Sequence, residues 1–137
     1  MGLLDFLKNK DAVSLEKEVS KWIDAVLPQN IPEEVAAFCF NLYDDGDGNW
    51  SMELVGTQCF DADDTDWPCD EITNFGTRKK MFHWNSAAKW EMVLDAMIVA
   101  LKAYLKNGKC AKLLKSQSGV GVGFVDGDVK ILYTRSV

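Results

Sequence analysis

Patterns that carry metal, thiol or membrane chemistry are scarce in this sequence. It has one histidine, His83, and four cysteines without a Cys-x-x-Cys pair, which are Cys39, Cys59, Cys69 and Cys110. A structural zinc site usually takes four soft ligands in two close pairs, and that pattern is missing. The apolar runs are also much shorter than the roughly 18 to 20 residues of a membrane-spanning helix. We therefore predict no metal, no cofactor and no membrane partner.

The first eight residues lack the features of a targeting signal. No basic segment precedes their apolar run, Asp5 interrupts that run, and Phe6 stands where a myristoylation signal needs Ser or Thr. We expect a cytoplasmic protein. Its cysteines are then predicted to be free thiols, because disulfides form in oxidising compartments.

The size and composition are those of a globular protein. The 137 residues are 47% hydrophobic and 26% charged, which excludes a disordered or collagen-like chain. The length suits a single domain over residues 1–137, and neither a repeat nor a linker divides it. A chain of this size buries about two thirds of its unfolded surface, so it supports one hydrophobic core.

Basic residues are missing from a long central stretch. Residues 22–77 contain thirteen Asp and Glu residues but no Lys or Arg, whereas residues 78–137 carry a net charge of +7 and the whole chain −6. Most of the acidic residues gather in residues 44–47 and 61–71. Like charges this close repel one another unless a cation or a basic partner neutralises them. The alternative is a solvated loop that only keeps the protein soluble.

The first half of the chain predicts a helix and a β-hairpin. Apolar residues at 15, 19, 22, 23 and 26 share one helical face, which Ser14 can cap and Pro28 ends. Residues 35–43 alternate as a strand does, although Pro32 and the two glutamates after it could instead open a short helix. Residues 44–49 have the composition of a turn to a second strand at 50–57. Residues 61–71 are predicted to be a loop, and the state of residues 72–84 is left open.

The second half predicts another helix and another hairpin. The helix runs from Asn85 and ends at residues 107 and 108, with a buried stripe formed by Trp90, Leu94, Met97, Leu101 and Tyr104 or Leu105. Residues 126 and 127 (Asp-Gly) are typical of a two-residue type I′ turn. That turn pairs Phe124 with Val129, Val122 with Ile131 and Val120 with Tyr133, with all six side chains on one face.

Together these elements predict an α+β fold. We expect an antiparallel sheet of four or more strands, built from two hairpins, with the two main helices packed on one face. Gly121 and Gly123 fall on the opposite face of the last hairpin. Glycine there permits a close approach to the backbone, for which packing is the favoured reason.

Two motifs resemble ligand-binding loops but do not complete them. Residues 45, 47 and 49 match the first three ligand positions of an EF-hand, but Trp50 and Gly56 stand where that loop needs Gly and Glu. The glycines at 119, 121 and 123 lead into a strand, so no helix N-terminus follows to receive a phosphate. His83 lies between two aromatic residues, which favours packing over catalysis. We therefore predict no catalytic residue.

Three segments carry a resemblance to a group of known proteins. They are Phe-Asn-Leu-Tyr at 40–43 leading to Trp-x-x-Glu-Leu-Val-Gly-Thr at 50–57, Phe-Asp-x-Asp-Asp-x-Asp-Trp-x-Cys-Asp-Glu at 60–71, and Gly-Val-Gly-Phe-Val-Asp-Gly-Asp at 121–128. Together they resemble a group of small bacterial proteins that is similar to the immunity proteins of polymorphic toxin systems. The resemblance covers residues 36–133. It implies a class of function and no defined binding residue.

The leading hypothesis is a non-enzymatic immunity protein that neutralises a basic toxin domain through its acidic loop. Trp67 would be an exposed aromatic anchor, and the carboxylates around it would steer the partner. The predicted partner-binding residues are Asp61, Asp63, Asp64, Asp66, Trp67, Asp70 and Glu71. The alternatives are a metal-dependent enzyme that uses the carboxylates of residues 61–71, and a housekeeping adaptor or homodimer with no ligand. A sequence pI near 4.7 disfavours nucleic acid as the partner.

Overall fold

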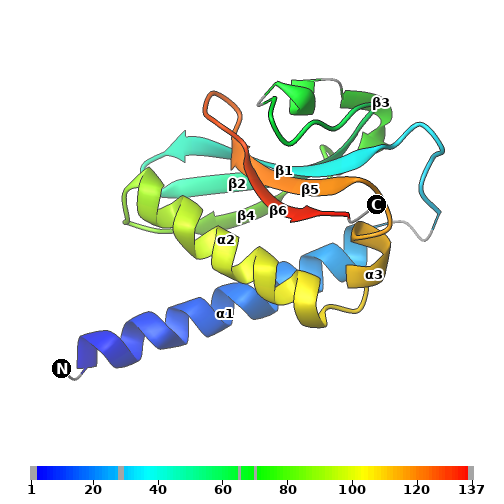
Figure 1. Cartoon of the computed structure of the whole chain (residues 1–137). Helices are drawn as coiled ribbons and strands as arrows, with labels where there is room; N and C mark the ends of the chain where they lie inside the picture. Colours follow the sequence, from blue (N-terminus) through cyan, green and yellow to red (C-terminus); the bar gives the residue numbers. More distant parts are fainter. Residues whose placement is uncertain (1–2, 28–29, 65, 70, 136–137) are drawn as a thin grey trace.

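A six-stranded sheet with helices on one face forms the body of the molecule (Figure 1). The computed structural model describes residues 3–27, 30–64, 66–69 and 71–135. The elements are α1 (Leu3–Val26), β1 (Ala37–Gly46), β2 (Asn49–Thr57), η1 (Trp67–Cys69), β3 (Glu71–Gly76), β4 (Phe82–Asn85), α2 (Trp90–Asn107), α3 (Ala111–Leu114), β5 (Gly119–Phe124) and β6 (Lys130–Thr134). The predicted α+β class is confirmed. None of the described helices is both long enough and apolar enough to cross a membrane.

The two hairpins of the sheet meet in a parallel pair of strands. The strand order is β3, β2, β1, β5, β6, and β4 also pairs with β2. β1 and β2 form the predicted hairpin, with Ala37 opposite Thr57 at its open end. β1 and β5 run parallel in the middle, so the sheet is mostly rather than wholly antiparallel. Residues 72–84, left open by the sequence, supply most of β3 and β4, and both strands run antiparallel to β2.

α1 and α2 cover the same face of the sheet, as predicted, and the main core lies between them and the strands (Figure 1). Phe38, Phe40 and Leu42 of β1 are fully buried there, because alternate side chains of a strand point to one face. Val19 and Ile23 of α1 are also fully buried, which confirms the predicted apolar face of the first helix.

α1 begins much earlier than the sequence predicts. It starts at Leu3, so Ser14 lies inside the helix and the prediction that Ser14 caps it is wrong. Residues 3–13 are rich in Leu and Lys and contain neither Gly nor Pro. Leu, Lys and Ala make up six of these eleven residues and have good helix propensity, and no helix breaker interrupts them, so the helix continues through the segment.

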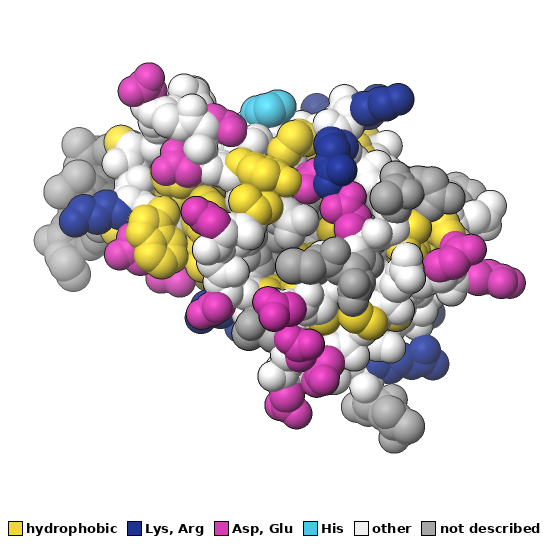
Figure 2. Space-filling view, turned by 90° about the horizontal axis from the view of Figure 1, so that it is seen from above, with side chains coloured by type: hydrophobic (Ala, Val, Ile, Leu, Met, Phe, Trp, Pro, Cys, Tyr) yellow, Lys and Arg dark blue, Asp and Glu magenta, His cyan; other side chains and the backbone are white. Residues whose placement is uncertain are grey.

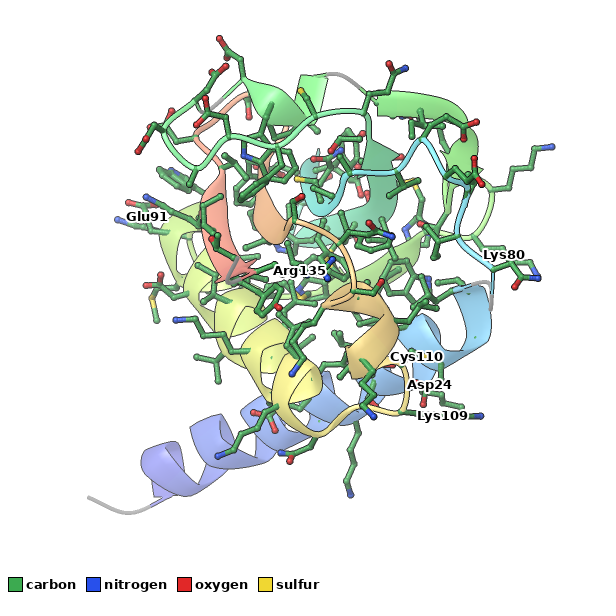
Figure 3. All side chains as sticks on the ribbon, turned by 45° about the vertical axis from the view of Figure 1, so that its right-hand side comes forward. Asp24, Lys80, Glu91, Lys109, Cys110 and Arg135 are labelled. Carbon is green, nitrogen blue, oxygen red and sulfur yellow. The ribbon has the colours of Figure 1, made fainter. Side chains whose placement is uncertain are left out.

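α2 ends at Asn107, where the sequence predicts its end, but for a different reason. Gly108 has an extended backbone with φ of −70°, so it does not adopt the left-handed conformation of a usual glycine stop. A Cβ at Gly108 would lie 2.4 Å from the ring of Tyr104, so the position requires glycine for space. The Tyr104 hydroxyl donates to Asp24 at 2.6 Å and accepts the backbone N–H of Cys110 at 2.9 Å. Asp24 and Cys110 therefore lie close together (Figure 3).

The predicted buried stripe of α2 is correct except at its first residue. Leu94, Met97 and Leu101 are buried, but the side chain of Trp90 is 54% exposed. Trp90 is the first residue of the helix, and it lies at an end of the helix where the sheet covers it only in part.

The β5–β6 hairpin pairs as predicted only at its open end. Val120 pairs with Tyr133, but a register shift follows, and Val122 pairs with Lys130 instead of Ile131. Ile131 consequently packs on the face opposite to Val120 and Val122. The prediction of one shared face for this hairpin is therefore wrong, because a shift of one residue moves a side chain to the other face.

The turn of that hairpin also differs from the prediction. Phe124 and Val129 are not paired in the strand ladder. Neither Asp126 nor Gly127 has a positive φ, whereas a type I′ turn needs it at both central residues. The Asp-Gly dipeptide therefore marks the turn correctly but not its type.

Candidate functional site

The predicted acidic loop lies on the face of the sheet that the helices leave free. The sequence predicts the loop at residues 61–71, whereas Glu71 begins β3, so the name acidic loop is used here for residues 58–70 between β2 and β3. Its described residues rise above the sheet in Figure 1. Figure 2 looks onto this face and shows a group of acidic side chains on it. Asp61, Asp63, Asp64 and Asp66 are all exposed. Asp70 lies outside the described residues.

Two of these carboxylates also shape the loop. Asp61 accepts the backbone N–H of Asp63 at 2.9 Å, and Asp64 accepts that of Asp66 at 2.9 Å. The backbone N–H of Asp64 donates to the carbonyl of Asp61 at 3.1 Å. Such turns, closed by an Asp side chain, explain part of the Asp content without any ligand. They also hold the other carboxylates in defined positions.

Trp67 holds the acidic loop against the sheet and is not an exposed anchor. Its side chain is 1% exposed, so the prediction of an exposed Trp67 is wrong. The ring of Phe60 packs edge-on against it, with centroids 4.9 Å apart. The indole N–H of Trp67 is buried without a hydrogen-bond partner among the described residues. Packing rather than hydrogen bonding therefore fixes this side chain.

The glycines of β5 provide the space for this packing. A Cβ at Gly119 would lie 2.3 Å from the ring of Phe60, and one at Gly121 would lie 2.8 Å from Trp67. A Cβ at Gly123 would lie 2.7 Å from the backbone oxygen of Asp128. The favoured interpretation of the glycines, close packing on the strand, is therefore confirmed.

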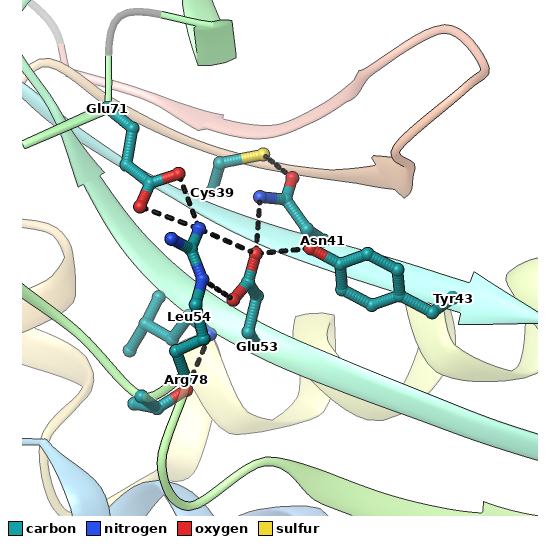
Figure 4. A network of polar contacts seen from close by, with 8 residues as sticks. Cys39, Asn41, Tyr43, Glu53, Leu54, Glu71 and Arg78 are labelled. Carbon is teal, nitrogen blue, oxygen red and sulfur yellow. Dashed lines mark hydrogen bonds and ion pairs between the residues drawn. The ribbon is translucent and has the colours of Figure 1, made fainter. Parts of the chain in front are cut away.

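Glu71 is partly buried and belongs to an ion-pair network between the buried Glu53 and the largely exposed Arg78, so it is not one of the fully exposed acidic residues. The network lies on the same face of the sheet (Figure 4). Arg78 donates through Nε to Glu53 at 3.0 Å, and through its terminal nitrogen to both Glu71 oxygens at 2.7 and 2.8 Å. Glu53 is 1% exposed and also accepts the hydroxyl of Tyr43 at 2.5 Å. Asn41 makes a longer contact of 3.5 Å with it.

The network keeps Glu53 ionised although it is buried. Burial alone would raise the pKa of Glu53, but the hydrogen bonds from Arg78 and Tyr43 and the charge of Arg78 outweigh it, so its pKa is lowered from 4.5. Burial and the neighbouring Glu53 carboxylate raise the pKa of the Tyr43 phenol. The two carboxylates also raise the pKa of Arg78. At neutral pH these shifts keep Glu53 ionised, Tyr43 protonated and Arg78 charged, so the three groups support structure rather than proton transfer.

A second acidic group lies next to the acidic loop. A hollow of about 270 Å³ is lined by Asp66 and Pro68 on one side and by Val125 and Asp126 of the β5–β6 turn on the other. Asp126 and Asp128 are exposed. The sequence separates these residues from the acidic loop by some sixty positions, and only the packing of both segments on β5 brings them together. A search for acidic clusters along the chain therefore misses them.

The described residues do not gather metal ligands. They contain no group of three or more His, Cys, Asp or Glu side chains able to hold a metal ion. Of the EF-hand-like residues, 45 lies at the end of β1, 47 lies between the strands and 49 begins β2, so strands and not helices flank this segment. His83 is exposed, so the prediction that it packs in an aromatic cluster is wrong. Cys39, Cys59 and Cys110 form no disulfide.

Comparison with known proteins finds no matching protein-family model, no matching curated protein and no matching solved structure.

Proposed function

We propose that this protein binds a basic protein partner through the acidic loop and the adjoining β5–β6 turn, as an immunity protein does when it neutralises a toxin domain. The observation that carries the proposal is a set of exposed carboxylates that form no ion pair among the described residues. Asp61, Asp63, Asp64 and Asp66 are exposed, and none of them forms an ion pair within the described residues. Asp126 and Asp128 extend this group across the turn of the last hairpin.

The order of the loop supports binding rather than mere solubility. Asp61 and Asp64 accept backbone N–H groups, and the buried Trp67 holds the loop down. A preorganised charged surface loses less conformational entropy on binding than a mobile one. A concentration of one sign of charge also speeds the approach of a partner of the opposite sign, by tenfold to a thousandfold at low salt.

The ion pairs of Arg78 remove two carboxylates of the central acidic stretch from the proposed surface. Glu53 and Glu71 are already paired with Arg78, so they add little to the field that a partner meets. The proposed contact set is therefore Asp61, Asp63, Asp64, Asp66, Asp126 and Asp128, with Trp67 in a supporting position.

The proposal is tested by capture of the tagged protein's partner from a lysate of the source organism at low and high salt. The test variant carries Asp63→Asn, Asp64→Asn and Asp66→Asn. Asn keeps the side-chain oxygen that accepts the turn hydrogen bond, so the loop is expected to keep its shape. A matched control carries Glu33→Gln, Glu34→Gln and Asp95→Asn, the same charge change at exposed positions outside the proposed surface.

We expect a stoichiometric basic partner that high salt and the loop variant release and the matched control retains. Association measured with the purified partner should become slower in the loop variant and lose most of its salt dependence. A partner that binds the loop variant as well as the wild type would refute the site. No salt-sensitive basic partner at all, with the protein folded, would refute the function.

A further inference from the structure

An exposed apolar patch lies at the end of the molecule where α2 begins. Trp90 and Val125 are 54% and 53% exposed, and they are among the few large apolar side chains that the structure leaves open to water. Trp90 starts α2 and Val125 follows β5, so the patch is formed by two separate elements. Phe124, the residue before Val125, packs edge-on against Trp90 with centroids 6.0 Å apart, which places the end of β5 next to the start of α2.

A rigid stack of rings supports this patch from below. Phe124 also packs against Trp50, with centroids 5.8 Å apart. Trp50 is 5% exposed, and its indole N–H donates to the carbonyl of Ser86 at 3.0 Å. The rings therefore lead from the core to the surface in fixed positions. An aromatic side chain held in this way loses little entropy when a partner covers it, which is typical of binding hot spots.

A hollow of about 550 Å³ lies beside Trp90 and has acidic walls. Its lining includes Trp50 and Trp90 and the acidic side chains of Asp44, Asp47 and Glu91. Figure 3 shows Glu91 at the start of α2, pointing outward. Lys89 is the one basic residue of the lining, so the walls carry a net negative charge.

The floor of the hollow is held in place by the turn between β1 and β2. The carbonyl of Gly48 accepts the backbone N–H of Ser86 at 2.9 Å, which ties the turn to the segment before α2. Gly46, Asp47 and Gly48 all have positive φ, with Asp47 at 55°. Asp tolerates this conformation at a small cost, and the ordered turn keeps the carboxylate of Asp47 at the hollow.

We propose that Trp90 and Val125 are the apolar centre of the partner interface, and that the hollow beside Trp90 takes an Arg or Lys side chain of that partner. A cation against an indole ring and between carboxylates gains from both interactions. An apolar side chain in the same place would desolvate the carboxylates without pairing them, so the hollow selects against it. The proposal rests on the basic partner proposed above.

The patch is continuous with the surface proposed for that partner. Val125 belongs to the patch and also lines the smaller hollow that Asp66 and Asp126 share. One partner can therefore contact the acidic loop, Val125 and Trp90 together. In this arrangement Trp90 has the anchoring role that the sequence assigns to Trp67.

The test uses the protein labelled with 5-fluorotryptophan, in which Trp90→Phe identifies the ¹⁹F resonance of Trp90. The labelled protein is titrated with the peptide N-acetyl-Gly-Arg-Gly-amide and, in parallel, with the same peptide carrying neutral citrulline in place of arginine. We expect the arginine peptide to shift the Trp90 resonance in a saturable way and the citrulline peptide not to. Asp44→Asn with Asp47→Asn should abolish the shift, whereas Glu33→Gln with Glu34→Gln should retain it.

A Trp90 resonance that the arginine peptide leaves unmoved, or that both peptides move equally, would overturn the proposal. The proposal would also be overturned if a second copy of this chain covers the patch. Sedimentation would then show a dimer, and Trp90→Ala would dissociate it. The proposed function and the proposed role of Trp90 can be refuted independently of each other. The peptide response should survive the triple Asn variant of the acidic loop, and a partner captured as described above should bind Trp90→Ala roughly fivefold to thirtyfold more weakly.

Discussion

Replacing Gly121 by alanine is expected to destabilise the protein by driving Trp67 away from β5. The added Cβ would lie 2.7 Å from Cγ2 of Val129 and 2.8 Å from Cζ2 of Trp67. Both distances are well below the 3.5 to 4.0 Å at which carbon atoms attract one another. Trp67 is almost fully buried, so its ring cannot turn aside without moving the acidic loop.

The expected loss follows from two opposing effects. Overpacking a filled site typically costs about 1 to 3 kcal/mol. Alanine restricts the unfolded chain more than glycine does, which returns about 0.4 to 1 kcal/mol. The net loss in the free energy of unfolding is therefore about 0 to 2.6 kcal/mol, centred on about 1.3 kcal/mol. With a urea dependence of ~1.5 kcal/mol/M, the unfolding midpoint falls by up to about 1.7 M, with a central value of about 0.9 M.

Urea unfolding followed by circular dichroism measures this loss, and the same hairpin supplies a control. A Cβ at Gly127 would meet its nearest atoms at 3.7 and 3.8 Å, an ordinary contact distance. Gly127→Ala is therefore expected to raise the midpoint slightly. Val129→Ala removes one of the two clashing groups, so its effect and that of Gly121→Ala should be less than additive. Equal midpoints for Gly121→Ala and Gly127→Ala would refute the packing of Trp67 on β5.

Three further changes test other parts of the fold. Arg78→Met should lower the free energy of unfolding by about 1 to 3 kcal/mol, because it leaves the Glu53 carboxylate buried without its cation. Arg78→Lys should recover part of this loss. Equal urea midpoints for the wild type and both variants would contradict the network. Because the pKa of folded Glu53 is below 4.5, its ionisation stabilises the fold above about pH 4.5, and this contribution is lost as the pH falls through the lower value. Urea unfolding at several pH values compares the wild type with Glu53→Gln. The difference in their free energies of unfolding should shrink in acid. A difference that stays constant with pH would contradict a lowered pKa of Glu53. Ser14→Ala should raise stability by up to about 0.5 kcal/mol in thermal unfolding, since Ser14 lies inside α1, whereas loss of a helix cap would lower it by about 1 kcal/mol.

Local patterns in the sequence predict most of the elements of this fold. The alternation in residues 37–43 and 50–57 places one side of each strand in the core, and the turn composition between them gives the hairpin. The 3.6-residue spacing in α1 and α2 likewise predicts which faces are buried. These patterns are reliable because each depends only on the spacing of apolar side chains within one helix or strand, and that spacing decides which face of the element is buried.

The features that the sequence does not predict depend on contacts between distant segments. Whether Trp67 is buried depends on which segment lies beneath its ring. That segment is β5 at Gly121, and only the parallel pairing of β1 with β5 brings Gly121 under the ring. The same pairing places Asp126 beside Asp66. Trp90 is exposed because of where the sheet ends relative to α2. The 3.6-residue spacing of apolar residues within the helix does not give this position.

The parallel pair of β1 and β5 also has a consequence for how the chain folds. Each hairpin joins neighbours in sequence, but β1 can meet β5 only after residues 47–118 have been brought round between them. Closing so long a loop costs entropy before any contact repays it. We expect the two hairpins to form first and the middle of the sheet last, so that Val122→Ala mainly speeds unfolding while Leu54→Ala also slows folding in stopped-flow measurements. The acidic loop and the β5–β6 turn sit on opposite sides of that last junction, so the proposed binding surface exists only once folding is complete.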